Sequence, residues 1–148
     1  MDVWKSDYKS KQGNAGLGAA IAYYTSIGVP TAIPLNDTQK YDLIVEQNNL
    51  LQRVSVKTTQ QKNKNNKYFV VQLRNTGGSS GKSKIRLFDP KSCDILFILT
   101  KDGTTYEIPT EKIKINNLFT LTDEWNSFIV KIDYGTSAQN ENSEVEEG

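Results

Sequence analysis

Residues 41–59 read YDLIVEQNNLLQRVSVKTT, and the pattern of this stretch decides the fold. The apolar run Tyr41–Glu46 is bounded by polar residues and is typical of a strand that is buried on both faces. Leu51–Thr59 alternates with a period of two, which also indicates a strand. Asn48 and Asn49 lie between the two runs and favour a hairpin turn. We therefore predict a β-hairpin at the heart of the fold.

The register of this hairpin brings two charged residues together. If Asn48 and Asn49 form a two-residue turn, Asp42 lies directly opposite Ser55, and Lys57 lies on the same face as Ser55. Burying a carboxylate or an ammonium alone costs several kcal/mol, so each needs a partner or a bound ion. Two interpretations follow. One is a structural Asp–Lys pair; the other is a site where Asp42 holds a divalent cation and Lys57 stabilises developing charge or orients a water.

A helix is expected before the hairpin, over residues 14–27, with Gly28 as its stop signal. Its apolar stripe consists of Leu17, Ile21 and Tyr24. Gly16 and Gly18 lower helix propensity near its start, which indicates close backbone packing there. We therefore expect the helix to lie against an apolar surface.

Further strands are expected at Thr31–Leu35, Lys67–Arg74, Asp94–Thr100 and Thr104–Ile108, the first of them at an edge because it contains Pro34. The segment Asp123–Tyr134 is ambiguous between helix and strand. The order of these elements predicts an α/β fold with an N-terminal helix packed on a mixed central β-sheet. Residues 1–135 form this domain, and residues 136–148, polar and acidic, are expected to be a disordered tail.

Composition excludes several kinds of chemistry. The chain of 148 residues is 36% hydrophobic and 24% charged, which fits one soluble domain. It has no membrane-spanning run and no signal-peptide core, so a cytoplasmic location is expected. With no histidine and one cysteine, Cys93, it lacks the residues for Ser-His-Asp catalysis, a zinc finger or an internal disulfide. Carboxylates, lysines and hard cations such as Mg²⁺ remain.

The net charge of +1 is unevenly distributed. No acidic residue lies between Glu46 and Asp89, where the basic residues are Arg53, Lys57, Lys62, Lys64, Lys67, Arg74, Lys82, Lys84 and Arg86. Such a segment favours a surface that faces a polyanion, although lysines that protect exposed strand edges would give the same composition. Within it, 76–83 (TGGSSGKS) is one glycine short of a P-loop, and the β-rich residues that follow argue against the helix a P-loop needs.

The ordered series of motifs resembles a known superfamily. The matching pieces are Ile33-Pro34-Leu35, Tyr41–Glu46 (YDLIVE) and Arg53–Thr59 (RVSVKTT), and the likeness covers roughly residues 9 to 132. The chain resembles the PD-(D/E)XK nuclease superfamily, and within it the small homing-endonuclease group associated with group I introns and phages. Asp followed by Ser-Val-Lys is a weak pattern by itself; the whole ordered series is more specific.

The resemblance implies a Mg²⁺-dependent, site-specific DNA endonuclease, with Mn²⁺ as a possible substitute. Asp42 matches the metal-binding aspartate, Lys57 the catalytic lysine, and the backbone carbonyl of Val56 a further metal ligand. Two positions depart from the family pattern. Ser55, with a secondary catalytic role, stands where the superfamily usually has Asp or Glu, and Leu17 stands where many members carry a glutamate.

The expected partner is double-stranded DNA, bound through the basic residues of the flexible loops and neighbouring strands. These are Lys62, Lys64, Lys67, Arg74, Lys82, Lys84 and Arg86. One subunit offers one nicking site, so cutting both strands predicts a homo-oligomer, either a dimer or a tetramer. Two alternatives stay open: a catalytically degenerate DNA-binding protein, which Leu17 and Ser55 motivate, and a nuclease that resembles Holliday-junction resolvases and reads DNA shape.

Overall fold

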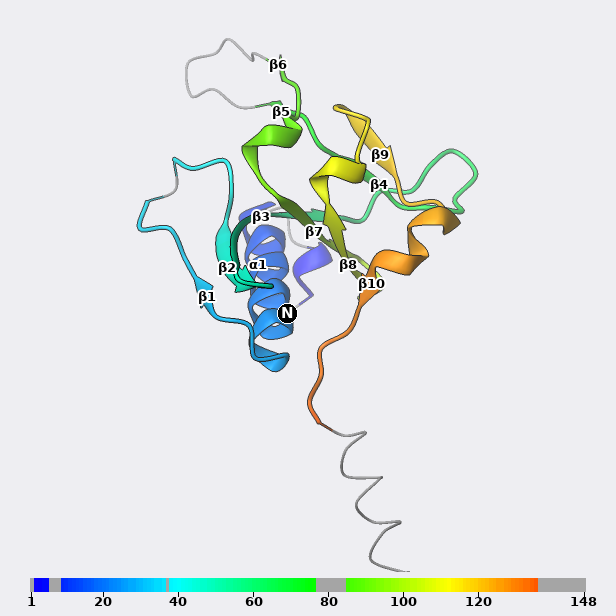
Figure 1. The fold of residues 1–148 in the computed structure, drawn as a ribbon. Helices are drawn as coiled ribbons and strands as arrows, with labels where there is room; N and C mark the ends of the chain where they lie inside the picture. Colours follow the sequence, from blue (N-terminus) through cyan, green and yellow to red (C-terminus); the bar gives the residue numbers. More distant parts are fainter. Residues whose placement is uncertain (1, 6–8, 37, 77–84, 136–148) are drawn as a thin grey trace, which may run out of the picture.

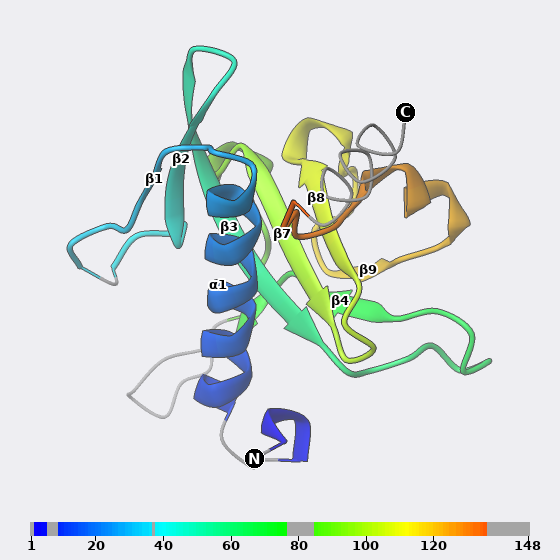
Figure 2. The same cartoon turned by 90° about the horizontal axis from the view of Figure 1, so that it is seen from below.

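The structure, a computed structural model, has a six-stranded mixed sheet with one long helix, α1 (Lys9–Ser26), across one face (Figures 1 and 2). It describes residues 2–5, 9–36, 38–76 and 85–135. The strand order is β1-β2-β3-β7-β8-β10, and all neighbours are antiparallel except β3 and β7. The strands are β1 (Thr31–Ala32), β2 (Leu43–Gln47), β3 (Leu50–Thr59), β7 (Ile95–Thr100), β8 (Thr105–Pro109) and β10 (Ile129–Val130).

Two small strand pairs lie outside this sheet. β4 (Val70–Gln72) pairs with β9 (Leu118–Thr120), and β5 (Asn75–Thr76) pairs with β6 (Ile85–Arg86). Short 3₁₀ turns are at Val3–Lys5, Pro90–Ser92, Thr110–Lys112 and Asp123–Phe128. No helix in the described part of the chain is long and apolar enough to cross a membrane.

The hairpin of β2 and β3 has the predicted turn and register. Asn48 and Asn49 have φ angles of 56° and 61°, the left-handed values that a two-residue hairpin turn requires. The pairing runs from Gln47 opposite Leu50 to Leu43 opposite Val54. The next residue outward on the first strand is Asp42, which stands at the open end of the hairpin, where its N–H bonds to the carbonyl of Val54.

The helix α1 begins five residues before the predicted start at position 14 and ends close to the predicted stop, where Gly28 has a φ of 75°. Its buried face consists of Ala20, Tyr23 and Tyr24, while Leu17 and Ile21 pack at the flank of the same core. The predicted stripe was therefore right about the face and wrong about its centre. The small Ala20 was not counted as an apolar contact, although its size lets the helix approach the sheet.

Gly16 lies where α1 passes closest to β3. A Cβ atom on Gly16 would stand 2.5 Å from Cγ2 of Thr58 and 3.1 Å from Cγ1 of Val56. Around Gly18 the same position is open, with no atom of the described residues outside the helix within 4 Å. The prediction of close packing is therefore confirmed for Gly16 and wrong for Gly18.

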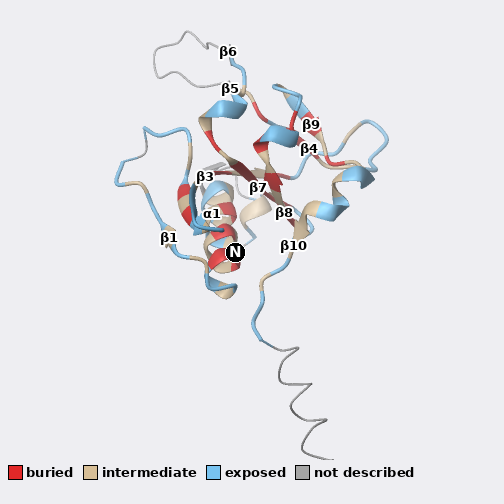
Figure 3. Ribbon diagram, in the orientation of Figure 1, coloured by how far each residue is buried: buried red, intermediate tan, exposed pale blue. Residues whose placement is uncertain are grey.

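Two cores lie on opposite faces of the sheet (Figure 3). The helix-side core contains Ala20, Tyr23, Tyr24, Leu43, Val45, Val54, Ile95 and Phe97. The outer core contains Val71, Leu73, Leu96, Ile98, Tyr106, Ile108, Ile113, Phe119 and Leu121. Because the outer core is built over β7 and β8, β2 is buried on one face only: Ile44 is half-buried and Glu46 is exposed. The prediction that this strand is buried on both faces was wrong.

Other segments differ from their predicted form for local reasons. Only Val70–Gln72 of the predicted strand 67–74 is a strand, and it pairs outside the central sheet. The segment Asp123–Tyr134 uses both predicted forms, first a 3₁₀ turn and then β10. Ile85 and Arg86 form a strand in place of the helix that a P-loop requires. The predicted acidic tail, residues 136–148, lies outside the described residues.

Candidate active site

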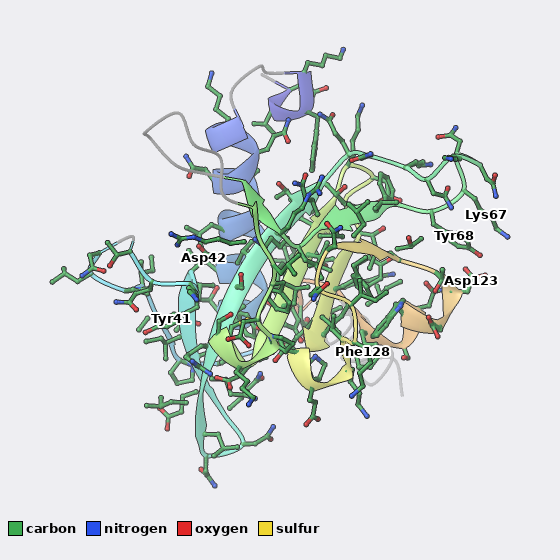
Figure 4. All side chains as sticks on the ribbon, turned by 90° about the horizontal axis from the view of Figure 1, so that it is seen from above. Tyr41, Asp42, Lys67, Tyr68, Asp123 and Phe128 are labelled. Carbon is green, nitrogen blue, oxygen red and sulfur yellow. The ribbon has the colours of Figure 1, made fainter. Side chains whose placement is uncertain are left out.

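Asp42 is held at the open end of the hairpin by two hydrogen bonds. Its backbone N–H donates to the carbonyl of Val54 at 2.8 Å, which extends the β2–β3 ladder by one bond. Its carboxylate oxygen Oδ2 accepts the backbone N–H of Val56 at 2.7 Å. The side chain is exposed and lies at one side of the molecule in Figure 4.

The carbonyl of Val56 points toward the same place. In a β-strand the N–H and the C=O of one residue face the same neighbouring strand. Because the Val56 N–H faces Asp42, the Val56 carbonyl does so too, at a level where β2 has already ended. The Val56 carbonyl, a hard oxygen donor, therefore faces the same side of β3 as the Asp42 carboxylate.

Ser55 and Lys57 lie on the face of β3 that is turned away from α1, where they line a cleft of about 250 Å³. We call it the Lys57 cleft. Its lining residues are Thr38, Gln39, Lys40, Ser55, Lys57, Leu73, Arg86, Leu87, Phe88, Asp89 and Ser92. Its lining comes from the segment before β2 on one side and from the segment between β6 and the turn at Pro90–Ser92 on the other.

The electrostatics of Lys57 are set by its partial burial. Burial lowers the pKa of the Lys57 ammonium, and the negative charge of Asp42 acts in the opposite direction. The two groups are therefore close enough to interact, yet they form no direct ion pair. Both interpretations of the two residues, a structural Asp–Lys pair and a site for a bound cation, therefore stay predictions.

A second hollow, of about 270 Å³, lies on the helix side of Asp42. We call it the Asp42 hollow. It is lined by Leu17, Ile33, Pro34, Leu35, Asn36, Gln39, Tyr41 and Asp42. Leu17 thus borders the site that the resemblance assigned to a glutamate on the first helix, while it also packs against the helix-side core. Its position fits the family pattern, and its side chain contributes an apolar wall.

The donor set at this site fits a magnesium ion that takes few protein ligands. Among the described residues no three His, Cys, Asp or Glu side chains gather in one place. The carboxylate of Asp42 and the carbonyl of Val56 are oxygen donors, which Mg²⁺ prefers, and Mg²⁺ usually keeps several waters and binds substrate phosphates. One carboxylate and one carbonyl therefore suit this ion, with water and phosphate as its further ligands.

A comparison with protein families decides the classification. The model of the PD-(D/E)XK endonuclease family matches residues 8–124. The chain belongs to the PD-(D/E)XK endonuclease family. The resemblance drawn from the ordered motifs is thus confirmed, and so is the nuclease fold.

The solved structures agree with this classification. A bacterial homing endonuclease, I-Ssp6803I, superposes with a TM-score of 0.67 over 78% of each chain, at 21% sequence identity. At that identity the likeness shows the shared fold. No curated protein matches the sequence.

In this PD-(D/E)XK endonuclease, the structure divides the basic residues that the sequence grouped together. Arg86 lines the Lys57 cleft. Lys62, Lys64 and Lys67 belong to a separate loop, and in Figure 4 Lys67 lies on the opposite side of the molecule from Asp42. The remaining members of the predicted set are Arg74, which is half-buried, and Lys82 and Lys84, which lie outside the described residues.

The loop with the three lysines has a defined shape. The Asn63 side chain accepts the backbone N–H groups of Lys67 and Tyr68, at 3.0 and 3.2 Å. The Lys62 ammonium lies 5.0 Å from the ring centre of Phe69, and the Lys67 ammonium lies 5.0 Å from that of Tyr68. Both cations thus rest on aromatic faces while they remain exposed. Their surface is distinct from the Lys57 cleft.

Three charged or polar residues of the cleft were missed by sequence reasoning. Gln39 lines both hollows, and Lys40 and Asp89 stand on opposite walls of the Lys57 cleft. Asp89 caps the following 3₁₀ turn, because its Oδ1 accepts the N–H of Lys91 at 2.9 Å. The sequence Asp-Pro does indicate such a turn, but nothing in it shows that the turn folds back over β3.

Proposed function

We propose that this protein is a Mg²⁺-dependent DNA endonuclease that hydrolyses phosphodiester bonds in double-stranded DNA at the site formed by Asp42, Val56 and Lys57. One observation carries the proposal: the Asp42 carboxylate accepts the N–H of Val56, the residue before Lys57, and the Asp42 charge acts on Lys57, which lines the neighbouring cleft. The family match and the shared fold support the same reaction class.

The residues divide the chemistry between them. Asp42 and the Val56 carbonyl hold the cation, and a bound divalent cation supplies the charge that polarises the scissile phosphate and activates water. Lys57 donates to the phosphate oxygens and offsets the negative charge that develops there. Partial burial strengthens this attraction because the local dielectric is lower than that of water. Ser55, 5% exposed in the cleft floor beside Lys57, has the secondary role of a hydroxyl donor.

The walls of the cleft position the DNA strand. Lys40 and Arg86 stand on opposite walls of the Lys57 cleft, where they contact phosphates on either side of the reacting one. Cleavage of both strands needs two such sites of opposite polarity, so the functional unit is a two-fold dimer or a tetramer built from two dimers. In such an oligomer each subunit reads one half of the target sequence, and the two halves together give the site specificity of a homing endonuclease.

The proposal is tested with a library of supercoiled plasmids that carry random inserts, incubated with Mg²⁺, with Mn²⁺ or with a chelator. We expect nicked and linear products in the presence of either metal and none with the chelator. The Asp42→Asn variant should bind the same DNA without cutting it. The control Asp123→Asn removes an exposed aspartate on the far side of the molecule and should cut like the wild type (Figure 4).

Other outcomes identify the competing functions. Salt-sensitive binding without cleavage on any substrate would establish a degenerate DNA-binding protein, consistent with Leu17 and Ser55 at the positions where the family carries acids. Preferential cleavage of four-way junctions over linear duplex would establish a resolvase-like nuclease. Absence of DNA binding even at low salt would contradict all three.

A further inference from the structure

Exposed aliphatic side chains stand on both walls of the site. Ile33 is 63% exposed and Leu35 is 104% exposed, and both line the Asp42 hollow. Leu87 is 56% exposed and lines the Lys57 cleft from the opposite wall. Single exposed leucines are ordinary on protein surfaces. Three that border one catalytic site from both sides call for a ligand with apolar faces.

The charge around these side chains identifies that ligand. Lys40, Lys57 and Arg86 line the Lys57 cleft together with Leu87, and Asp89 is the acidic residue in that lining. Ile33 and Leu35 line the Asp42 hollow, which shares Gln39 with this cleft. The centres of protein–protein interfaces are depleted in charged residues, whereas DNA offers phosphates to cations and base faces to aliphatic groups. Charge complementarity therefore favours DNA over a second protein chain.

Leu35 is held by a stiff segment. The ring of Pro34, between Ile33 and Leu35, fixes its own φ and restricts Ile33 to extended conformations. Upstream, Thr31 and Ala32 pair with β2 and anchor the segment to the sheet. Downstream, the Asn36 side chain accepts hydrogen bonds from Thr38 at 2.8 Å and from Gln39 at 3.5 Å. The leucine thus projects from a strand edge beside Asp42 on a short, braced loop.

We propose that Leu35 is a wedge that inserts between base pairs beside the scissile phosphate, with Ile33 behind it and Leu87 opposite, so that the enzyme unstacks and kinks its DNA at the cutting site. Apolar side chains of this kind unstack base steps at a cost of a few kcal/mol, which contacts in the bent complex offset. The enzyme then prefers flexible pyrimidine–purine steps and DNA that is already distorted. This inference rests on the proposed DNA endonuclease function.

The test uses short duplexes that carry 2-aminopurine, a fluorescent adenine analogue, in a TA step, with Ca²⁺ in place of Mg²⁺ to suppress cutting. A matched duplex carries a bulge at the same step. The variants are Leu35→Ala and Leu87→Ala, with Leu50→Ala as the control. Leu50 is 61% exposed and lies at the other end of the hairpin, opposite Gln47, which is about 17 Å along the strand from Asp42 at roughly 3.3 Å per residue.

With wild type and Leu50→Ala we expect 2-aminopurine fluorescence to rise on binding as the base unstacks. Leu35→Ala should lose most of this rise and bind the intact duplex about 10-fold more weakly, which corresponds to about 1.4 kcal/mol. Its affinity for the bulged duplex should stay within about 3-fold of wild type, because the bulge has already unstacked the step. Leu87→Ala should show the same pattern with a smaller loss.

Equal fluorescence and equal affinity for Leu35→Ala and Leu50→Ala would overturn the wedge and leave the endonuclease proposal intact. A change in oligomeric mass of Leu35→Ala in the absence of DNA, with unchanged fluorescence, would assign the leucines to a protein interface and also overturn it. If the wild type binds neither duplex at low salt, the proposed function itself fails. The two failures are therefore distinguishable.

Discussion

The contact between α1 and β3 at Gly16 gives a quantitative prediction. A Cβ at this position would stand 2.5 Å from Thr58 Cγ2, whereas carbon atoms pack at roughly 3.5–4.0 Å. Relief therefore requires the helix or the strand to move by about 1 Å. Thr58 is β-branched and stiff at χ1, so its side chain cannot simply rotate away. Gly16→Ala must push the helix away from the strand that carries Lys57.

The magnitude follows from two opposing effects. Overpacking a core position costs about 1–3 kcal/mol. Alanine in place of glycine gains about 1 kcal/mol of helix propensity. Gly18→Ala is the matched control, because the space around Gly18 is open and the variant keeps only the gain. We expect Gly18→Ala to raise the free energy of unfolding by about 1 kcal/mol and Gly16→Ala to lie about 1–3 kcal/mol below Gly18→Ala.

The assay is urea unfolding followed by tryptophan fluorescence and circular dichroism, with both variants measured beside the wild type. Trp125 is a suitable probe because it packs against Phe119 with ring centres 4.8 Å apart. Plasmid cleavage should fall on the order of 10²-fold for Gly16→Ala and little for Gly18→Ala, because Val56 and Thr58 flank Lys57, the proposed catalytic lysine. Equal stability of the two variants would refute the close approach.

Three further predictions concern charges and the hairpin turn. Because burial lowers the pKa of Lys57 and Asp42 raises it, NMR titration of the Lys57 side chain should give a pKa below the usual 10.5, and Asp42→Asn should lower it further. Stability should accordingly rise as pH increases from the lowered pKa toward 10.5, since the unfolded chain then binds more protons. A Lys57 pKa that rises in Asp42→Asn would contradict the interaction. Arg53 lowers the pKa of Asp94 at a distance of 3.2 Å, so stability present above the usual 3.8 should be lost as pH falls through the lowered value, and Asp94→Asn should flatten this acid limb in urea titrations. Asn49→Gly should keep or raise the unfolding midpoint and Asn49→Ala should lower it, because the φ of 61° suits glycine; the opposite order would contradict the turn.

The hairpin and the sheet order near it could be predicted because their signals are local. Asn48-Asn49 fixes the turn, the turn fixes the register, and the register runs to Leu43 opposite Val54, one residue before Asp42. The register does not predict the direction in which the Asp42 carboxylate points. Asp42 turns its Oδ2 onto the Val56 N–H because β2 has ended and this N–H has lost its strand partner. A backbone N–H loses its partner where the neighbouring strand ends, and no pattern of residue types in the sequence indicates this.

The walls of the cleft could not be predicted, because they depend on contacts between segments far apart in the chain. Lys40 and Arg86 line the same cleft, although they are 46 positions apart and neither lies in a periodic run. The same limit applies to the segment 67–74. Its alternation is that of a strand, but the strand pairs with β9 outside the central sheet. This pairing depends on the outer core, into which Val71 and Phe119 of the two strands pack.

Assignment of Asp42 and Lys57 as the reacting residues is tested most directly by single-turnover cleavage of a preformed enzyme–DNA complex. The complex is assembled in Ca²⁺ on a fragment that the wild type cuts, and the reaction is started with excess Mg²⁺. Asp42→Asn and Lys57→Met should cut at least about 10³-fold more slowly than the wild type, with DNA dissociation constants within about 3-fold of it. Cleavage by either variant at the wild-type rate would contradict the proposed site.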